Sequence, residues 1–143
     1  MKKTVILILS LLWITSVTGQ AKEIAFLGLT KAAIKSRLDA STFITKIEEK
    51  ITDKGIHYYW CETQGSWMCA YNFSENGKCF QFSIMDSPEL AIVNGWRKNL
   101  NDSFTITGKD KWEDRSGSIK VFWKLMLVDK AVWIQASYKE PNH

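Results

Sequence analysis

Strand-like segments joined by tight-turn sequences constrain the fold of this chain more than any other feature. Residues 56–61, 67–73 and 79–85 are rich in aromatic and β-branched residues, which favour strands. The Asn76-Gly77 pair between the last two segments readily adopts the positive φ angles of a tight hairpin. This part of the sequence therefore predicts antiparallel strands joined by hairpins.

A second strand pair is predicted near the C-terminus. Every second residue from 119 to 127 is apolar, and these residues would share one face, opposite Lys120, Phe122 and Lys124. A turn at 128–130 leads to a last strand at 132–136. Whether residues 104–112 add a short strand stays open.

Two segments have helical patterns. Thr30 is a suitable N-cap for a helix ending near Asp39, and Ser87 is a suitable N-cap, with Pro88 at the first helical position, for a second helix. Residues 42–51 fit either a helix or a strand. Their many β-branched residues and the turn that follows favour a strand. We therefore expect an α+β fold, in which an antiparallel sheet of about a four-strand meander plus a C-terminal hairpin carries two helices on one face.

The N-terminus has the pattern of a secretory signal peptide. Lys2 and Lys3 precede an apolar stretch at 5–17, and small residues follow it. This stretch is shorter than the roughly 20 apolar residues that a stable membrane-spanning helix requires. We expect residues 1–19 to be removed, with the exact cleavage site open, and 20–143 to form one soluble periplasmic or secreted domain. No cysteine follows the apolar stretch to carry a lipid.

Charge argues against a nucleic-acid partner. Without Lys2 and Lys3, 17 of the 19 basic residues remain against 15 acidic ones, so the charge is close to balanced. Nucleic-acid-binding domains concentrate basic residues on one face, and this sequence has no such cluster. We expect neither a nucleic-acid partner nor an integral membrane segment after signal cleavage.

Three cysteines, Cys61, Cys69 and Cys79, are candidates for chemistry. Cys61 and Cys69 flank a predicted turn and would lie opposite each other, in range of a disulfide, if the loop between them has an odd number of residues. Alternatively, all three are small buried apolar residues. His57 with the three cysteines has the composition of a zinc site but not its close spacing, so we expect no metal.

No catalytic motif is recognisable, so we expect a non-enzymatic protein without a cofactor. No nucleophile elbow, zinc-protease motif or phosphate-binding loop is present. His57 and Cys61, on one predicted strand, are about 13 Å apart and cannot share a hydrogen bond. An enzyme would need carboxylates that only the fold could bring together.

Tryptophans are the most unusual feature of the composition. Six of the seven lie beyond residue 19, and core packing is the favoured reading of most of them. Trp112, in a charged segment, and Trp67, beside a turn, are the best candidates for exposed binding residues. We expect binding of a protein partner in the cell envelope. The alternative is a carrier for a small ligand or sugar in a cavity lined by Trp60, Trp96 or Trp123.

Residues 26–31, Phe-Leu-Gly-Leu-Thr-Lys, with Ile34 and Leu38, resemble the first-helix signature of small exported proteins of Gram-negative bacteria. These include the small accessory lipoprotein of outer-membrane barrel assembly and the β-lactamase-inhibitor-like folds. The segment at 72–79 resembles a hairpin of such proteins. The resemblance implies a short helix followed by an antiparallel sheet, and an interaction role. The chain departs from the assembly lipoprotein because it lacks a lipidated cysteine, and no functional residue carries over.

Overall fold

The computed structural model describes residues 26–65, 67–117 and 119–138, and the predicted signal peptide at 1–19 lies outside them. The described residues form two helices and one eight-stranded antiparallel sheet. The elements in chain order are α2 (Lys31–Ala40), β1 (Ile44–Ile51), β2 (His57–Thr63), β3 (Met68–Phe73), β4 (Cys79–Asp86), α3 (Leu90–Ser103), β5 (Thr105–Gly108), β6 (Lys111–Asp114), β7 (Val121–Val128) and β8 (Ala131–Ser137).

Helix α2 begins and ends as expected. The Thr30 hydroxyl accepts a hydrogen bond from the Ala33 amide at 3.3 Å, which satisfies one of the free N–H groups of the first turn. Ile34 and Leu38 are buried one turn apart, so a single face of the helix packs on the sheet. Residues 44–51 form a strand rather than a helix, as their β-branched residues favoured.

Helix α3 begins later than expected. Its N-cap is Glu89 without a side-chain cap, and the expected N-cap role of Ser87 is wrong. The Ser87 hydroxyl instead accepts a hydrogen bond from the Glu89 amide at 3.4 Å, within the turn that precedes the helix. Val93 and Leu100 face the core, whereas Leu90 is 72% exposed.

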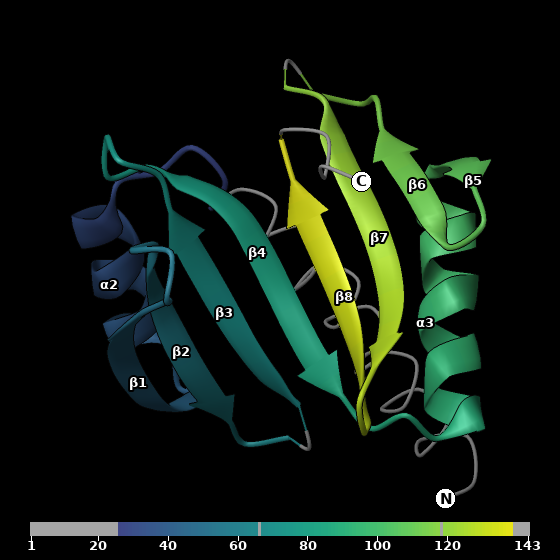
Figure 1. Ribbon diagram of the computed structural model, residues 1–143, viewed down its shortest axis with the longest axis horizontal. Helices are drawn as coiled ribbons and strands as arrows, with labels where there is room; N and C mark the ends of the chain where they lie inside the picture. Colours follow the sequence, from purple (N-terminus) through teal and green to yellow (C-terminus); the bar gives the residue numbers. More distant parts are fainter. Residues whose placement is uncertain (1–25, 66, 118, 139–143) are drawn as a thin grey trace, which may run out of the picture.

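The sheet consists of two four-strand meanders joined edge to edge. Its strand order is β1-β2-β3-β4-β8-β7-β6-β5 (Figure 1). Strands β4 and β8 pair at the junction, where Ile84 lies opposite Ile134. Each meander follows a helix in the chain, so the unit of one helix and four strands occurs twice.

The expected fold class is confirmed, but the expected sheet is too small. An α+β fold with an antiparallel sheet and two helices is present. Strands β5 and β6 extend the expected C-terminal hairpin to a second meander. They are only four residues each, and β5 is exposed along its whole length, so alternation in the sequence gave little signal for them.

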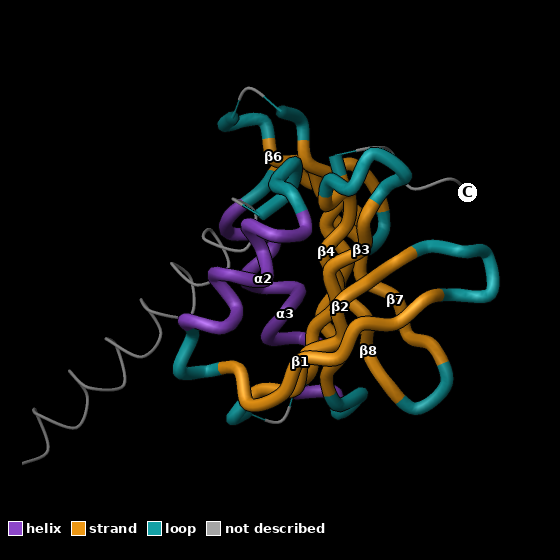
Figure 2. The backbone as a smooth tube through the Cα atoms, turned by 90° about the vertical axis from the view of Figure 1, so that its left-hand side faces the viewer, coloured by secondary structure: helices purple, strands orange, loops and turns teal. Residues whose placement is uncertain are grey.

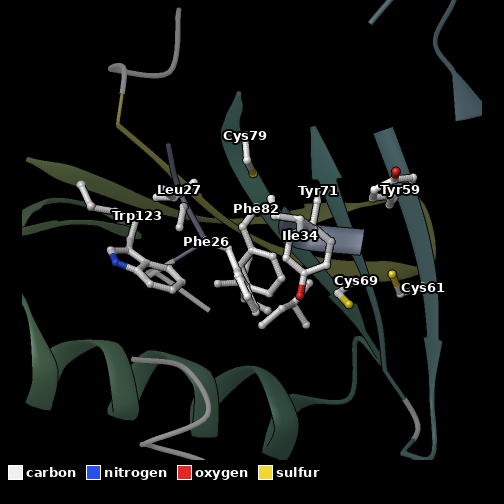
Figure 3. Close-up of a cluster of buried hydrophobic side chains, with 14 of the residues drawn as sticks. Phe26, Leu27, Ile34, Tyr59, Cys61, Cys69, Tyr71, Cys79, Phe82 and Trp123 are labelled. Atoms are coloured by element: carbon white, nitrogen blue, oxygen red, sulfur yellow. The ribbon is translucent and has the colours of Figure 1, made fainter. Parts of the chain in front are cut away.

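The core lies between the sheet and the helices, which both lie on the same side of the sheet (Figure 2). One row of register partners runs through six strands of this side and is buried throughout; it comprises Tyr59, Tyr71, Phe82, Ala136, Trp123 and Trp112. Tyr71 and Phe82 have ring centroids 5.1 Å apart, and Phe26 meets Tyr71 edge-on at 5.6 Å (Figure 3). Full burial of each large apolar side chain contributes about 1.5–3 kcal/mol.

No helix of the described segments is both long enough and apolar enough to cross a membrane.

Candidate functional site

Trp112 is not an exposed binding residue, and that prediction is wrong. Only 3% of its surface is exposed, and it lies opposite Trp123 in the core row. Its indole Nε1 donates a hydrogen bond to Oδ1 of Asn101, on α3, at 2.8 Å. The charged neighbours of Trp112 concealed a short strand, whose alternation directs the indole toward the helices.

Trp67, the second predicted binding residue, is half-buried beside the β2–β3 turn. Its ring packs against Phe43 with centroids 5.3 Å apart, and its carbonyl accepts a hydrogen bond from the Thr63 hydroxyl at 2.6 Å. It also packs against the core cluster. These contacts account for Trp67 as part of the hairpin, and its binding role stays a prediction.

Cys61 and Cys69 lie directly opposite each other on β2 and β3, as an odd-numbered loop requires. Both are buried on the helix side of the sheet (Figure 3). Directly opposed residues of an antiparallel pair have Cα atoms about 4.5–5.5 Å apart, within the range that a disulfide spans. No disulfide joins the two cysteines in the structure. The register nevertheless satisfies the geometric condition for the bond, which stays a prediction.

The side of the sheet turned away from α2 and α3, here called the open face, carries the remaining unusual residues. No helix of the described residues covers this side (Figure 2). Met68, Met85, Trp133 and Met126 are consecutive register partners across β3, β4, β8 and β7. We call these four residues the Met–Trp row. Each of them is half-buried, so part of each side chain reaches solvent.

All methionines except Met1 belong to this row. Register partners share one face of a sheet, so the four side chains form a continuous apolar band across the four central strands. Methionine is flexible and polarizable, and it is common at surfaces that adapt to a partner. Tryptophan is among the residues that contribute most to binding energy at interfaces.

The adjacent row on the open face includes Trp60, which lies opposite Glu48 of β1. Trp60 is half-buried and lies opposite Ala70, which lies opposite Ser83. The ammonium of Lys50 lies 5.6 Å from the centroid of the Trp60 ring, in position for a cation–π interaction. Ala70 and Ser83 are small and buried, so this part of the surface is lined by the larger residues around them.

Charged residues on the β1 side of the open face compensate one another. Glu48 accepts hydrogen bonds from Lys46 at 2.8 Å and Lys50 at 3.2 Å. The bond from Lys46, and then that from Lys50, lowers the pKa of Glu48, and Glu48 in turn raises the pKa of Lys46. A further carboxylate, Glu62, lies 3.8 Å from Lys46. The β1 strand therefore presents a network of ion pairs rather than an uncompensated charge.

Glu113, on β6, is held in a similar way. Lys120 Nζ lies 2.8 Å from its Oε1 and Arg115 Nη2 lies 3.0 Å from its Oε2. These two cations, Lys120 first, lower the pKa of Glu113. An ionised carboxylate held by two cations is poorly suited to general acid–base work near neutral pH, which requires a pKa close to the working pH.

The tryptophans named for the alternative ligand cavity do not all lie on one side of the sheet, and the carrier role stays a prediction. Trp60 lies on the open face and Trp123 on the helix side, so Trp60, Trp96 and Trp123 do not surround one cavity. The Trp96 indole donates to Oδ2 of Asp86 at 3.0 Å. Across the parts of the chain that the structure describes, no three His, Cys, Asp or Glu side chains gather as a metal site would require.

Reasoning from the sequence missed the Met–Trp row. Its only local signal is that strands such as β8 are apolar on both faces, with Trp133 between the buried Val132 and Ile134. The row itself depends on the register of four strands, two of which are joined by the long-range β4–β8 pairing. Comparison of the chain with protein-family models, with curated proteins and with solved structures finds no match in any of the three.

Proposed function

We propose that this chain is a non-enzymatic exported protein that binds a protein partner through the Met–Trp row of its open face. The observation that carries the proposal is the alignment of Met68, Met85, Trp133 and Met126 in one half-buried band. A sheet face that contacts only water usually carries polar residues, so four large apolar side chains in succession are unusual there. A partner that covers them would remove this apolar area from water.

Export is the second part of the proposal. It is supported by Lys2, Lys3 and the apolar stretch at 5–17. The test is N-terminal sequencing of the protein recovered from the medium or the periplasm. Recovery of the uncleaved chain from the cytoplasm alone would contradict export and leave the binding role unaffected.

The binding role is tested by affinity capture from an envelope fraction with three baits. These are the wild type, Trp133→Ala on the open face, and Leu90→Ala on α3. Leu90 is 72% exposed, so Leu90→Ala removes an exposed apolar side chain from the other side of the molecule. Captured proteins are quantified by mass spectrometry, and the fold of each bait is checked by circular dichroism.

We expect a partner that the wild type and Leu90→Ala retain equally and that Trp133→Ala loses by tenfold or more, about 1.4 kcal/mol. Such a loss is typical of a central aromatic residue at an interface. If every captured protein binds the three baits equally, the open face is not the interface and the proposal is wrong.

A further inference from the structure

Two lysines on the open face point to the chemistry of the partner. Lys111 on β6 and Lys124 on β7 lie directly opposite each other, and Lys124 also lies opposite Gln135 on β8. Continuing across the sheet, this row passes through Ser83 and Ala70. The lysine pair therefore lies on the same face as the Met–Trp row and belongs to the row beside it.

The lysine pair has no carboxylate partner among residues 26–65, 67–117 and 119–138. Three other lysines of these segments lie on this face, and each of them pairs with a glutamate. They are Lys46, Lys50 and Lys120. Asp110, the chain neighbour of Lys111, is bound by Arg97. Glu113, two residues further along β6, is held by Arg115 and Lys120.

This arrangement costs stability in the isolated protein. Directly opposed residues have Cβ atoms about 4.5–5.5 Å apart, and like charges there are destabilising. Both lysines are half-buried rather than fully extended into water. A carboxylate bound between the two ammonium groups would replace repulsion by attraction, and the apolar surroundings would strengthen that attraction.

We infer that the partner presents a protein segment in which an Asp or Glu lies beside an apolar anchor residue. The anchor contacts Met126 and Trp133, and the carboxylate binds between Lys111 and Lys124. Met126 is two residues from Lys124 on the same face of β7, about 7 Å along the strand. One short acidic and apolar segment can therefore reach both features. The inference rests on the proposed function, because it names the chemistry of the partner at that same face.

The same charge could attract a phosphate-rich polymer or an anionic membrane, but the observations favour a protein. Polyanion binding relies on many uncompensated cations, whereas this face offers one pair beside an apolar band. Each of the remaining basic residues named on it pairs with a glutamate. An isolated cation pair next to methionine and tryptophan matches a single carboxylate better than a chain of phosphates.

The experiment selects peptides from a random display library against the full-length exported protein. We expect the enriched peptides to combine Asp or Glu with an aromatic or long aliphatic residue. For one enriched peptide, affinities are then measured in a double-mutant cycle that combines Lys124→Gln with replacement of the peptide carboxylate by its amide. A coupling of about fivefold in Kd is expected for a direct charge pair. Lys130→Gln, in the exposed β7–β8 turn, is the control for the same change in net charge.

The outcomes separate the inference from the proposed function. Peptides that lose binding in Trp133→Ala but not in Lys111→Gln or Lys124→Gln would overturn the inference and leave the proposed function intact. Peptides indifferent to Trp133→Ala, or no enriched peptide at all, would overturn both. Binding of single-stranded DNA or phosphatidylglycerol vesicles that depends on the two lysines would show a polyanion site and overturn the inference.

Discussion

Met85 on β4 and Trp133 on β8 lie directly opposite each other where the two four-strand meanders join. Both are half-buried on the open face, while their chain neighbours Ile84 and Ile134 are paired and buried on the helix side. The junction is therefore apolar on both faces. One face is the core of the protein, and the other is the centre of the proposed interface.

Substitution of Trp123 on the helix side and of Trp133 on the open face tests which side of the sheet is the core. Trp123 is 2% exposed and stacks on Phe104 with centroids 5.2 Å apart, so Trp123→Ala should lower the free energy of unfolding by about 3–5 kcal/mol. Trp133→Ala should cost only about 1–2 kcal/mol because its side chain is already partly in water. Urea denaturation measures both. Equal losses would mean that Trp133 is a core residue.

The three methionines of the Met–Trp row should be oxidised in the folded protein. Dilute hydrogen peroxide converts exposed methionine to its sulfoxide, and Met68, Met85 and Met126 are half-buried rather than buried. Peptide mapping should find sulfoxide at all three while circular dichroism is unchanged. A bound peptide from the selection should slow their oxidation. Oxidation that occurs only after unfolding would show that the open face is covered.

Trp112 should behave as a core residue whose hydrogen bond stabilises the folded protein. Asn101→Ala removes the acceptor of its Nε1–H, 2.8 Å away. A buried donor without an acceptor costs about 1–3 kcal/mol. The matched control is Asn94→Ala, at an exposed position of the same helix. This change should leave the stability unchanged or raise it slightly. Similar unfolding midpoints for the two variants would argue against the hydrogen bond.

The Arg97–Asp110 ion pair should make the protein sensitive to acid. Arg97 donates to both carboxylate oxygens of Asp110, at 2.8 and 3.1 Å, and this lowers the pKa of Asp110. The folded-state pKa lies below the unfolded value. The pair therefore stabilises the protein fully above the unfolded-state pKa, and that stabilisation is lost as the pH falls through the folded-state pKa.

Asp110→Asn should reduce stability at neutral pH and weaken its decline in acid. Asn tolerates the positive φ of 55° at this position, so the backbone is retained. Thermal unfolding between neutral and acidic pH measures the difference from wild type, which should shrink as the pH falls. Asp102→Asn removes an exposed ion pair with Lys98 and should have the smaller effect, since exposed pairs contribute about 0–1 kcal/mol.

If the protein is exported into an oxidising compartment, as proposed, Cys61 and Cys69 should form a disulfide there. Their register already brings them opposite each other, so the bond needs little backbone movement. The measurement is the intact mass before and after alkylation, for the native protein and for the unfolded, unreduced protein. It should show one disulfide and one thiol, at Cys79. Cys61→Ser should abolish the disulfide. Alkylation of all three cysteines in the unfolded, unreduced protein would contradict the prediction.

Local patterns sufficed for most elements but not for the candidate site. The cap at Thr30, the Asn76-Gly77 turn and the alternation that includes Val121 are short-range features, and each produced the expected element. Trp112 shows the limit. A four-residue strand in a charged segment is too short to show which way its side chains point, and only pairing with β7 turns this indole inward.

The sequence by itself determined the α+β class, α2, and the antiparallel hairpins, because helix caps, tight turns and alternation act over a few residues. Only the tertiary structure decided how the strands align across the β4–β8 junction. A shift of that register by one residue would move every side chain of a strand to the other face. The Met–Trp row and the Lys111–Lys124 pair exist only through such long-range pairing, which no local pattern encodes.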